Sequence, residues 1–111
     1  MPKRSDRIDE AFKALADPTR RQVVELLVSG PAATSSLARR FEMSLPSFTQ
    51  HLSVLEQAGL VTSTKRGRVR TYQLSATGLD AVDGWLADQR RLWVQRLDQL
   101  DEFLTDNKET P

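Results

Sequence analysis

SLPSFTQHL at residues 44–52 and TKRGRVRTY at residues 64–72 decide the fold of this chain. In the first segment Phe48 and Leu52 stand four residues apart, which is the spacing of one face of a helix. The second segment has the two-residue period of a strand and turns around Arg66 and Gly67, as a β-hairpin with strands over residues 60–62 and 68–74 does. We therefore expect a short amphipathic helix followed by a basic hairpin.

Helical patterns flank these two segments. Three helices are expected before them, over residues 5–16, residues 18–28 and a short stretch that Thr34 or Ser35 caps. Ser75 can cap a last helix over residues 76–105. The expected fold is mainly α with a small β-hairpin wing: a winged helix-turn-helix in the order α-α-α-α-β-β-α.

Length and composition favour one ordinary globular domain over residues 1–111. The chain has 111 residues, 39% of them hydrophobic and 28% charged, and no apolar run approaches the roughly 18 residues that cross a bilayer. With no membrane segment and no apolar signal core at the N-terminus, we expect a cytoplasmic protein. The absence of cysteine excludes disulfides and thiolate metal sites.

A net charge of +1 hides a polarised molecule. Residues 39–72 carry six cations against two acids, while the last fourteen residues carry five acids. One sign of charge therefore gathers around the expected helix and hairpin, and double-stranded DNA is the partner that such a surface fits best.

Short polar side chains near the start of a helix suit entry into a DNA major groove. Gln50 is the best candidate for reading a base, because its amide can pair with adenine, and the hairpin cations suit phosphates. The predicted DNA-binding residues are Ser44, Leu45, Pro46, Ser47, Thr49, Gln50, His51, Lys65, Arg66, Arg68 and Arg70. Cap residues and a solvated edge strand are the alternatives. Further backbone contacts could come from Arg20, Arg21, Arg39 and Arg40.

The last helix is too long for its own domain. Its apolar stripe implies a rod of about 40 Å, against a diameter of about 26 Å for a domain of this size. So much apolar surface on a projecting helix requires a second copy of the chain. The predicted dimer-interface residues are Ile8, Phe12, Leu79, Val82, Trp85, Leu86, Trp93, Leu97, Leu100 and Leu104. An effector pocket is the alternative for Trp85 and Trp93.

Catalysis and metal binding have little support in the sequence. His51 is the only histidine, and no acid/base pair, activated nucleophile or Gly-rich phosphate loop is evident. We expect no enzyme, no metal and no cofactor.

Four segments resemble the ArsR/SmtB family of bacterial winged helix-turn-helix repressors: ALADPTRR at 14–21, SLPSFTQHL at 44–52, LEQAGLV at 55–61 and GRVRTYQL at 67–74. The resemblance implies a homodimer, paired through its first and last helices, that binds an inverted-repeat operator and represses transcription. It also implies that residues 44–58 form the reading helix and residues 65–70 the wing tip.

The sequence departs from the metal-sensing members of that family. Ser35 and Ser36 stand near the place where many members carry a cysteine pair, and the last helix has no histidine. The chain resembles the cysteine-free branch that does not sense metals and has two tryptophans in the last helix. We therefore expect a DNA-binding regulator, with a protein-binding winged helix that never touches DNA as the alternative. Any small-molecule effector is unknown.

Overall fold

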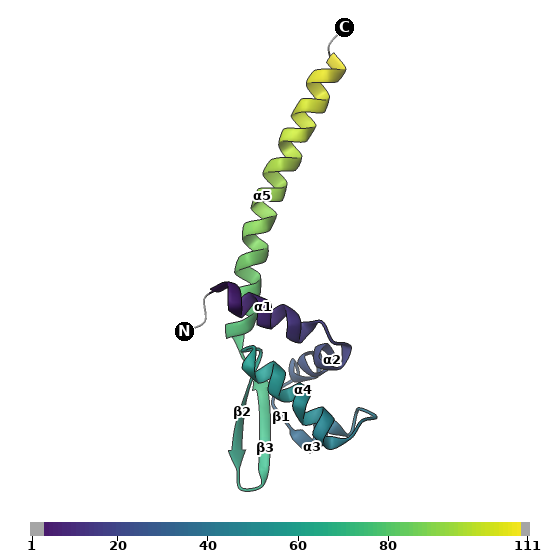
Figure 1. Cartoon of the computed structure of the whole chain (residues 1–111), viewed down its shortest axis with the longest axis vertical. Coiled ribbons are helices and arrows are strands. Elements are labelled where there is room, and N and C mark those ends of the chain that lie inside the picture. Colours follow the sequence, from purple (N-terminus) through teal and green to yellow (C-terminus); the bar gives the residue numbers. More distant parts are fainter. Residues whose placement is uncertain (1–3, 110–111) are drawn as a thin grey trace.

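The computed structural model describes residues 4–109, with the side chains of residues 6–106. The elements in chain order are α1 (Arg4–Leu15), α2 (Pro18–Leu27), β1 (Ala32–Ala33), α3 (Thr34–Ala38), α4 (Leu45–Gln57), β2 (Val61–Arg66), β3 (Val69–Leu74) and α5 (Ala76–Glu109). Helices α1 to α4, the strands and the start of α5 form a head, from which the rest of α5 projects (Figure 1). We call residues 90–109 of α5 the rod.

Helix α4 begins and ends where its sequence directs. The Ser44 side chain caps it by accepting a hydrogen bond from the Ser47 backbone, and Pro46 lies in the first turn, where its missing N–H costs nothing. At the other end Gly59 has a φ of +75°, and the Leu60 N–H donates to the Leu55 carbonyl over 3.0 Å. That left-handed glycine and backward bond form a Schellman motif, which turns the chain directly into β2.

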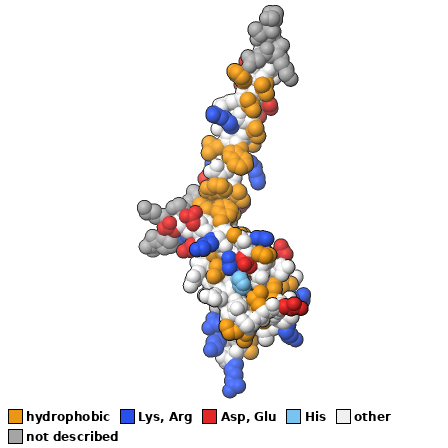
Figure 2. All heavy atoms as spheres, turned by 45° about the vertical axis from the view of Figure 1, so that its right-hand side comes forward, with side chains coloured by type: hydrophobic (Ala, Val, Ile, Leu, Met, Phe, Trp, Pro, Cys, Tyr) orange, Lys and Arg blue, Asp and Glu red, His pale blue; other side chains and the backbone are white. Residues whose placement is uncertain are grey.

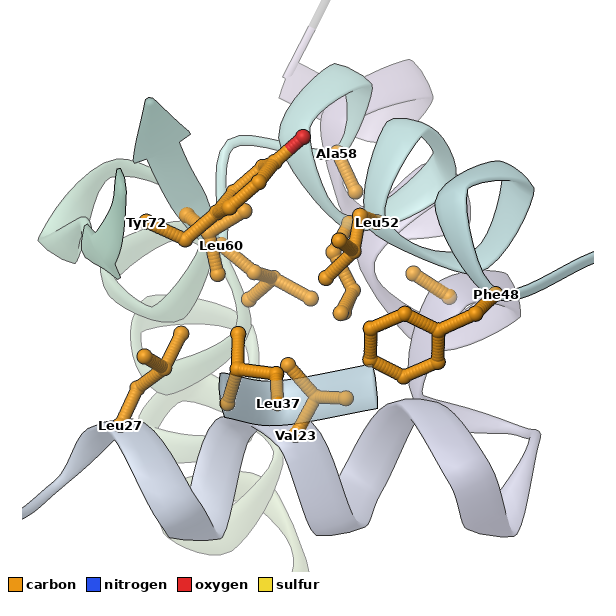
Figure 3. Packing of buried hydrophobic residues seen from close by; sticks show 11 residues of the cluster. Val23, Leu27, Leu37, Phe48, Leu52, Ala58, Leu60 and Tyr72 are labelled. Atoms are coloured by element: carbon orange, nitrogen blue, oxygen red, sulfur yellow. The ribbon is translucent and has the colours of Figure 1, made fainter. Parts of the chain in front are cut away.

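The core of the head lies between α4 and the elements around it (Figure 3). Phe48, Leu52 and Leu55 of α4 are almost completely buried, as their helical spacing predicts. They share one cluster with Val23 of α2 and Leu37 of α3. Burying a side chain of this size contributes about 1.5 to 3 kcal/mol, so this cluster holds the position of α4 in the head.

The three strands form one antiparallel sheet in the order β1-β3-β2. Strands β2 and β3 pair from Val61↔Leu74 to Arg66↔Val69, which leaves Gly67 and Arg68 as a two-residue turn. Gly67 has a φ of +60°, and glycine at the first turn position is typical of a type II′ hairpin. Strand β1 pairs only with Thr71 and Tyr72, so the far end of the hairpin projects beyond the sheet's third strand.

The predicted fold class is confirmed, with four differences in detail. The structure adds β1, a strand too short for a two-residue period to be detected. Neither Thr34 nor Ser35 caps α3: its N-cap is Ala33 without a side-chain bond, and Thr34 Oγ1 donates to the Arg70 carbonyl. The turn lies at Gly67 and Arg68 instead of at Arg66 and Gly67, and β2 extends to Arg66 instead of ending at residue 62. Helix α5 runs beyond the predicted residues 76–105.

Helix α5 joins the head through close backbone contact with the end of α4. The Gly78 N–H donates to the Gly59 carbonyl over 2.8 Å, and the Ser75 N–H donates to the Leu60 carbonyl over 3.0 Å. A Cβ atom on Gly78 would lie 2.6 Å from the Ala58 carbonyl oxygen, which is closer than atoms can approach. Only glycine fits this joint without a backbone shift.

The rod has exposed side chains along the whole of residues 90–106. At about 1.5 Å per residue, the 34 residues of α5 extend about 51 Å, longer than the expected 40 Å. Orange hydrophobic atoms follow the rod along its length (Figure 2). Among the described residues, no helix is both long enough and apolar enough to cross a membrane.

Candidate nucleic-acid interface

The N-terminal half of α4 presents small polar side chains to solvent. Leu45, Ser47, Thr49 and Gln50 are exposed, whereas Phe48 between them is buried. Ser44 Oγ donates to Ser47 Oγ over 2.9 Å, and Thr49 Oγ1 donates to the Pro46 carbonyl over 3.0 Å. The hydroxyls of Ser44 and Thr49 therefore serve the helix itself, while Gln50 has an exposed amide suited to a base edge.

The wing, residues 61–74, carries the predicted cations beyond the packed part of the sheet. Lys65 and Arg70 are paired across the two strands, so their side chains leave the same face. Arg66 pairs with Val69 on the other face, and Arg68 lies in the turn. Basic side chains gather at this end of the molecule, opposite the rod (Figure 2).

Like charges directly opposite each other destabilise a hairpin, so the pairing of Lys65 with Arg70 does not itself stabilise the two strands. All four wing cations are exposed, and Val69 is 53% exposed beside them. A polyanion would neutralise the repulsion that the free hairpin carries. The four wing cations are therefore candidate contacts for a negatively charged partner.

A hydrogen-bonded chain connects the wing to the C-terminal half of α4. Arg70 Nη1 donates to Ser63 Oγ over 2.8 Å, and Ser63 Oγ donates to Glu56 Oε2 over 2.8 Å. Burial, and then the Glu56 charge, raise the pKa of Tyr72 on the same face, while Arg70 lowers it. Arg70 therefore helps to fix the wing against α4 in addition to adding positive charge.

His51 differs from the other predicted DNA-binding residues because it is half-buried. Its Nδ1 lies 3.1 Å from Arg20 Nη1 and 4.0 Å from Asp17 Oδ1. Asp17 caps α2 by accepting from the Thr19 and Arg20 backbone N–H groups. Desolvation alone would raise the pKa of Asp17, but the backbone N–H groups of Arg20 and Thr19 and the Arg20 charge outweigh it and lower that pKa.

Arg20 and Arg21 bind backbone carbonyls at the end of α1. Arg20 Nε donates to the Ala14 carbonyl over 2.6 Å and Arg20 Nη2 to the Lys13 carbonyl over 3.1 Å, while Arg21 Nη1 donates to the Leu15 carbonyl over 2.7 Å. Cations favour helix C-termini, so both side chains stabilise α1 and the turn that follows it. Arg20 and Arg21, predicted as possible contacts to the DNA backbone, therefore have a role within the fold.

Two exposed residues of α4 were absent from the predicted set. Ser53 and Gln57 follow Gln50 by three and seven residues, so the three lie on one outer face of α4. Their spacing from Gln50 is the signal in the sequence that identifies them. We add both residues to the candidate interface.

The predicted dimer residues divide into two groups. Ile8 and Val82 are each 8% exposed, and they lie on α1 and α5, which pack together in the head. The Phe12 and Trp85 rings also meet there, edge to face, with centroids 5.5 Å apart. Phe12 and Trp85 nevertheless remain 40% and 37% exposed, and the other six residues are exposed as well: Leu79, Leu86, Trp93, Leu97, Leu100 and Leu104.

Metal-ligating side chains do not gather in this part of the chain. Over residues 6–106 the structure brings together no group of three or more histidine, aspartate or glutamate side chains that could hold a metal ion. The side chains of the candidate interface are the polar residues of α4 and the cations of the wing, and they offer hydrogen bonds and positive charge.

Sequence comparison relates the chain to transcription regulators. The model of a helix-turn-helix domain family matches residues 15–64. The HTH-type transcriptional regulator Rv2034 of Mycobacterium tuberculosis is 46% identical over 89 residues, which are 80% of each chain. The transcriptional repressor SdpR of Bacillus subtilis is 34% identical over 71% of this chain and 88% of its own length.

Solved structures share the arrangement of the elements. The crystal structure of an ArsR family transcriptional regulator matches with a TM-score of 0.78 and 45% identity, over 84% of this chain and 96% of that one. The homodimeric winged helix-turn-helix DNA-binding domain Mb0332 from Mycobacterium bovis matches with a TM-score of 0.60 and 26% identity, over 85% of this chain and 84% of that one. Both the sequence and the fold therefore have relatives among regulators of transcription.

Proposed function

Because this chain belongs to the ArsR family of transcriptional regulators, we propose that it binds double-stranded DNA as a homodimer and represses transcription at an inverted-repeat operator. Helix α4 enters the major groove, and the wing contacts the neighbouring backbone. In a symmetric dimer the two α4 helices reach successive major grooves about 34 Å apart, which requires a palindromic site.

The observation that carries this proposal is the opposed cation pair of the wing, Lys65 and Arg70, next to the polar face of α4. An acidic protein surface could pair with the cations of the wing, but it would not explain the polar face of α4. DNA uses both surfaces, because phosphates take up the cations while base edges pair with amides and hydroxyls.

The rod supports the homodimer. It leaves large apolar side chains exposed at Leu92, Trp93, Val94, Leu97, Leu100, Phe103 and Leu104. Apolar patches of this extent on a soluble protein mark an interface, and a symmetric copy covers them with the same residues. The solved homodimeric domain of this fold supports the same assembly.

Repression is the simpler mechanism, because a dimer on its operator blocks access to a promoter. The relative SdpR is named a repressor, which favours this direction. Binding chromosomal DNA would place the protein in the cytoplasm, and acting through DNA occupancy requires no catalysis.

A salt titration tests DNA binding. If each protomer neutralises about four phosphates through its four wing cations, the logarithm of affinity should fall against the logarithm of salt concentration with a slope near −7 for the dimer. The duplex should come from sequencing the genomic fragments that the protein retains. A slope shallower than about −3, or fragments without an inverted repeat, would contradict the proposed contacts.

Two single variants separate base reading from phosphate binding. Gln50→Ala should lower the preference for one base position by about 1 to 3 kcal/mol, because it removes one amide from the groove. Arg68→Ala should weaken operator and random duplex alike, and should make the salt slope shallower by roughly 2 for the dimer. Equal losses of Gln50→Ala on both duplexes would refute the base-reading role. An unchanged slope for Arg68→Ala would refute its phosphate contact.

A further inference from the structure

His51 has one ring nitrogen occupied by the protein and the other available to a partner. Arg20 Nη1 lies 3.1 Å from Nδ1. A guanidinium group carries donors and no acceptor, so Nδ1 must be the acceptor in this hydrogen bond. With Nδ1 accepting, the ring hydrogen lies on Nε2.

Arg20 is itself fixed, so this choice of tautomer is built into the head. Its Nε and Nη2 donate to the Ala14 and Lys13 carbonyls of α1, which sets the plane of the guanidinium before His51 meets it. The third donor, Nη1, is then aimed at α4. Arg20 thus links the end of α1 to the middle of α4.

The His51 Nε2 atom reaches the surface. No described residue forms a hydrogen bond with it, and among residues 6–106 no buried side-chain nitrogen or oxygen lacks a partner. An unpartnered Nε2 must therefore be open to solvent, and the His51 side chain is 22% exposed. Figure 2 shows the ring in pale blue on the surface of the head.

Ser44, Ser47 and His51 follow one another by three and four residues, so they form a row along one flank of α4. Ser47 Oγ accepts from Ser44 Oγ, which leaves the Ser47 hydroxyl hydrogen for an outside acceptor. The flank therefore offers neutral O–H and N–H donors, while Gln50 lies on the outer face. Phosphate oxygens beside a groove accept such bonds.

We propose that His51 binds a DNA backbone phosphate through its Nε2–H, and that Arg20 is the positioning residue that fixes the tautomer for this contact. The assignment rests on the proposed DNA binding and separates the α4 side chains into two groups. The flank that carries His51 binds phosphate, and the face that carries Gln50 reads bases. A contact through this N–H brings no lysine or arginine to the phosphate, so it should hold the helix in register without adding to the salt dependence.

Two substitutions at position 51 separate the two nitrogens. In His51→Asn the side-chain oxygen can take the place of Nδ1 and keep the bond to Arg20, but the outward donor is lost. In His51→Gln the amide N–H can take the place of Nε2. A hydrogen bond to a charged group contributes about 1.5 kcal/mol or more, so His51→Asn should lose on the order of tenfold affinity per half-site.

The loss in His51→Asn should be equal on operator and random duplex, with the salt slope unchanged, and His51→Gln should recover most of it. Wild-type affinity in His51→Asn would overturn the phosphate contact. A loss on operator alone would also overturn it, because that pattern belongs to a base contact. If the wild-type protein binds no duplex at all, the proposed function fails instead.

Nuclear magnetic resonance of the wild-type protein tests the tautomer without a variant. Long-range correlations of the imidazole should show hydrogen on Nε2 and none on Nδ1, and Arg20→Ala should lower the population of that tautomer. The Nε2 signal should shift when operator duplex is added, and the shift should vanish when one phosphate per half-site is replaced by an uncharged methylphosphonate. Hydrogen on Nδ1 would overturn the proposal even if every variant failed to fold.

Discussion

The head and the rod treat their apolar side chains in opposite ways. In the head, Phe48, Leu52 and Leu55 are no more than 1% exposed, and no described side chain has a buried polar atom without a partner. In the rod, Trp93 is 65% exposed and Leu97 59% exposed, although both follow the same helical spacing. The head buries these apolar side chains within one chain, whereas the apolar side chains of the rod need a second copy to cover them.

This difference assigns separate tasks to the two regions. The head buries the inner face of α4 completely, so the polar outer face is presented in a fixed position. In the proposed dimer, the rod determines how far apart the two heads are held. Affinity for one half-site should thus depend on the head, and affinity for a whole palindrome on the rod.

The largest expected effect comes from a charge on the rod. Leu97→Asp places a carboxylate in the surface that a second copy covers, where an unpaired charge costs several kcal/mol. The dimer should dissociate at micromolar concentration, and operator affinity should fall about 100- to 10,000-fold because the two half-sites are no longer bound together. Sedimentation and a binding titration measure the two effects.

Gln95→Asp is the matched control, because residue 95 precedes residue 97 by two positions and lies across the helix from it. Its added charge stays in solvent, so dimer and affinity should be retained. Circular dichroism should show a folded head in both variants. A Leu97→Asp protein that remains dimeric would contradict the proposal that the rod forms the dimer interface.

A smaller effect is expected at the joint between the two regions. Gly78→Ala puts a methyl group 2.6 Å from the Ala58 carbonyl oxygen, and only backbone can move aside. Strain of this kind costs about 1 to 3 kcal/mol, which thermal or urea unfolding will detect. The variant should also change the preferred spacing of half-sites, because α5 leaves the head at a different angle.

Gly84→Ala provides the comparison within the same helix. Alanine is favoured over glycine inside a helix by about 1 kcal/mol, so this variant should be as stable as the wild type or more stable. If Gly78→Ala were equally harmless, the close approach of α5 to α4 would not hold α5 to the head.

Local sequence signals were sufficient for the parts of the fold that depend on neighbours in the chain. Ser44 and Gly59 mark the two ends of α4, because a hydroxyl cap and a left-handed glycine act within four or five residues. Phe48, Leu52 and Leu55 identified the buried face by spacing alone. The wing could be predicted in the same way, since Gly67 and the alternating pattern around it define a hairpin.

Features that depend on distant residues could not be predicted. Strand β1 has two residues and exists because β3 offers an unpaired edge. Arg20 looked like a DNA-contacting cation, but its donors meet carbonyls six and seven residues back and a histidine 31 residues away. Nothing local distinguishes Gly78 from an ordinary helical glycine, because its importance comes from Ala58 on another helix.

The smallest expected effect concerns the cap of α2, within the head. The folded protein lowers the pKa of Asp17 below its ordinary value, so the carboxylate stabilises the head above the unfolded-state pKa, and this contribution is lost as pH falls through the folded-state pKa. Asp17→Ala should lose about 1 kcal/mol near neutral pH, while Asp17→Asn keeps the cap and removes the titrating group. Urea unfolding should therefore show that the wild type loses more stability than Asp17→Asn when the pH is lowered from about 5 to 2. A difference that is constant with pH would mean that the charge of Asp17 does not contribute, and that only its hydrogen bonds to the start of α2 stabilise the head.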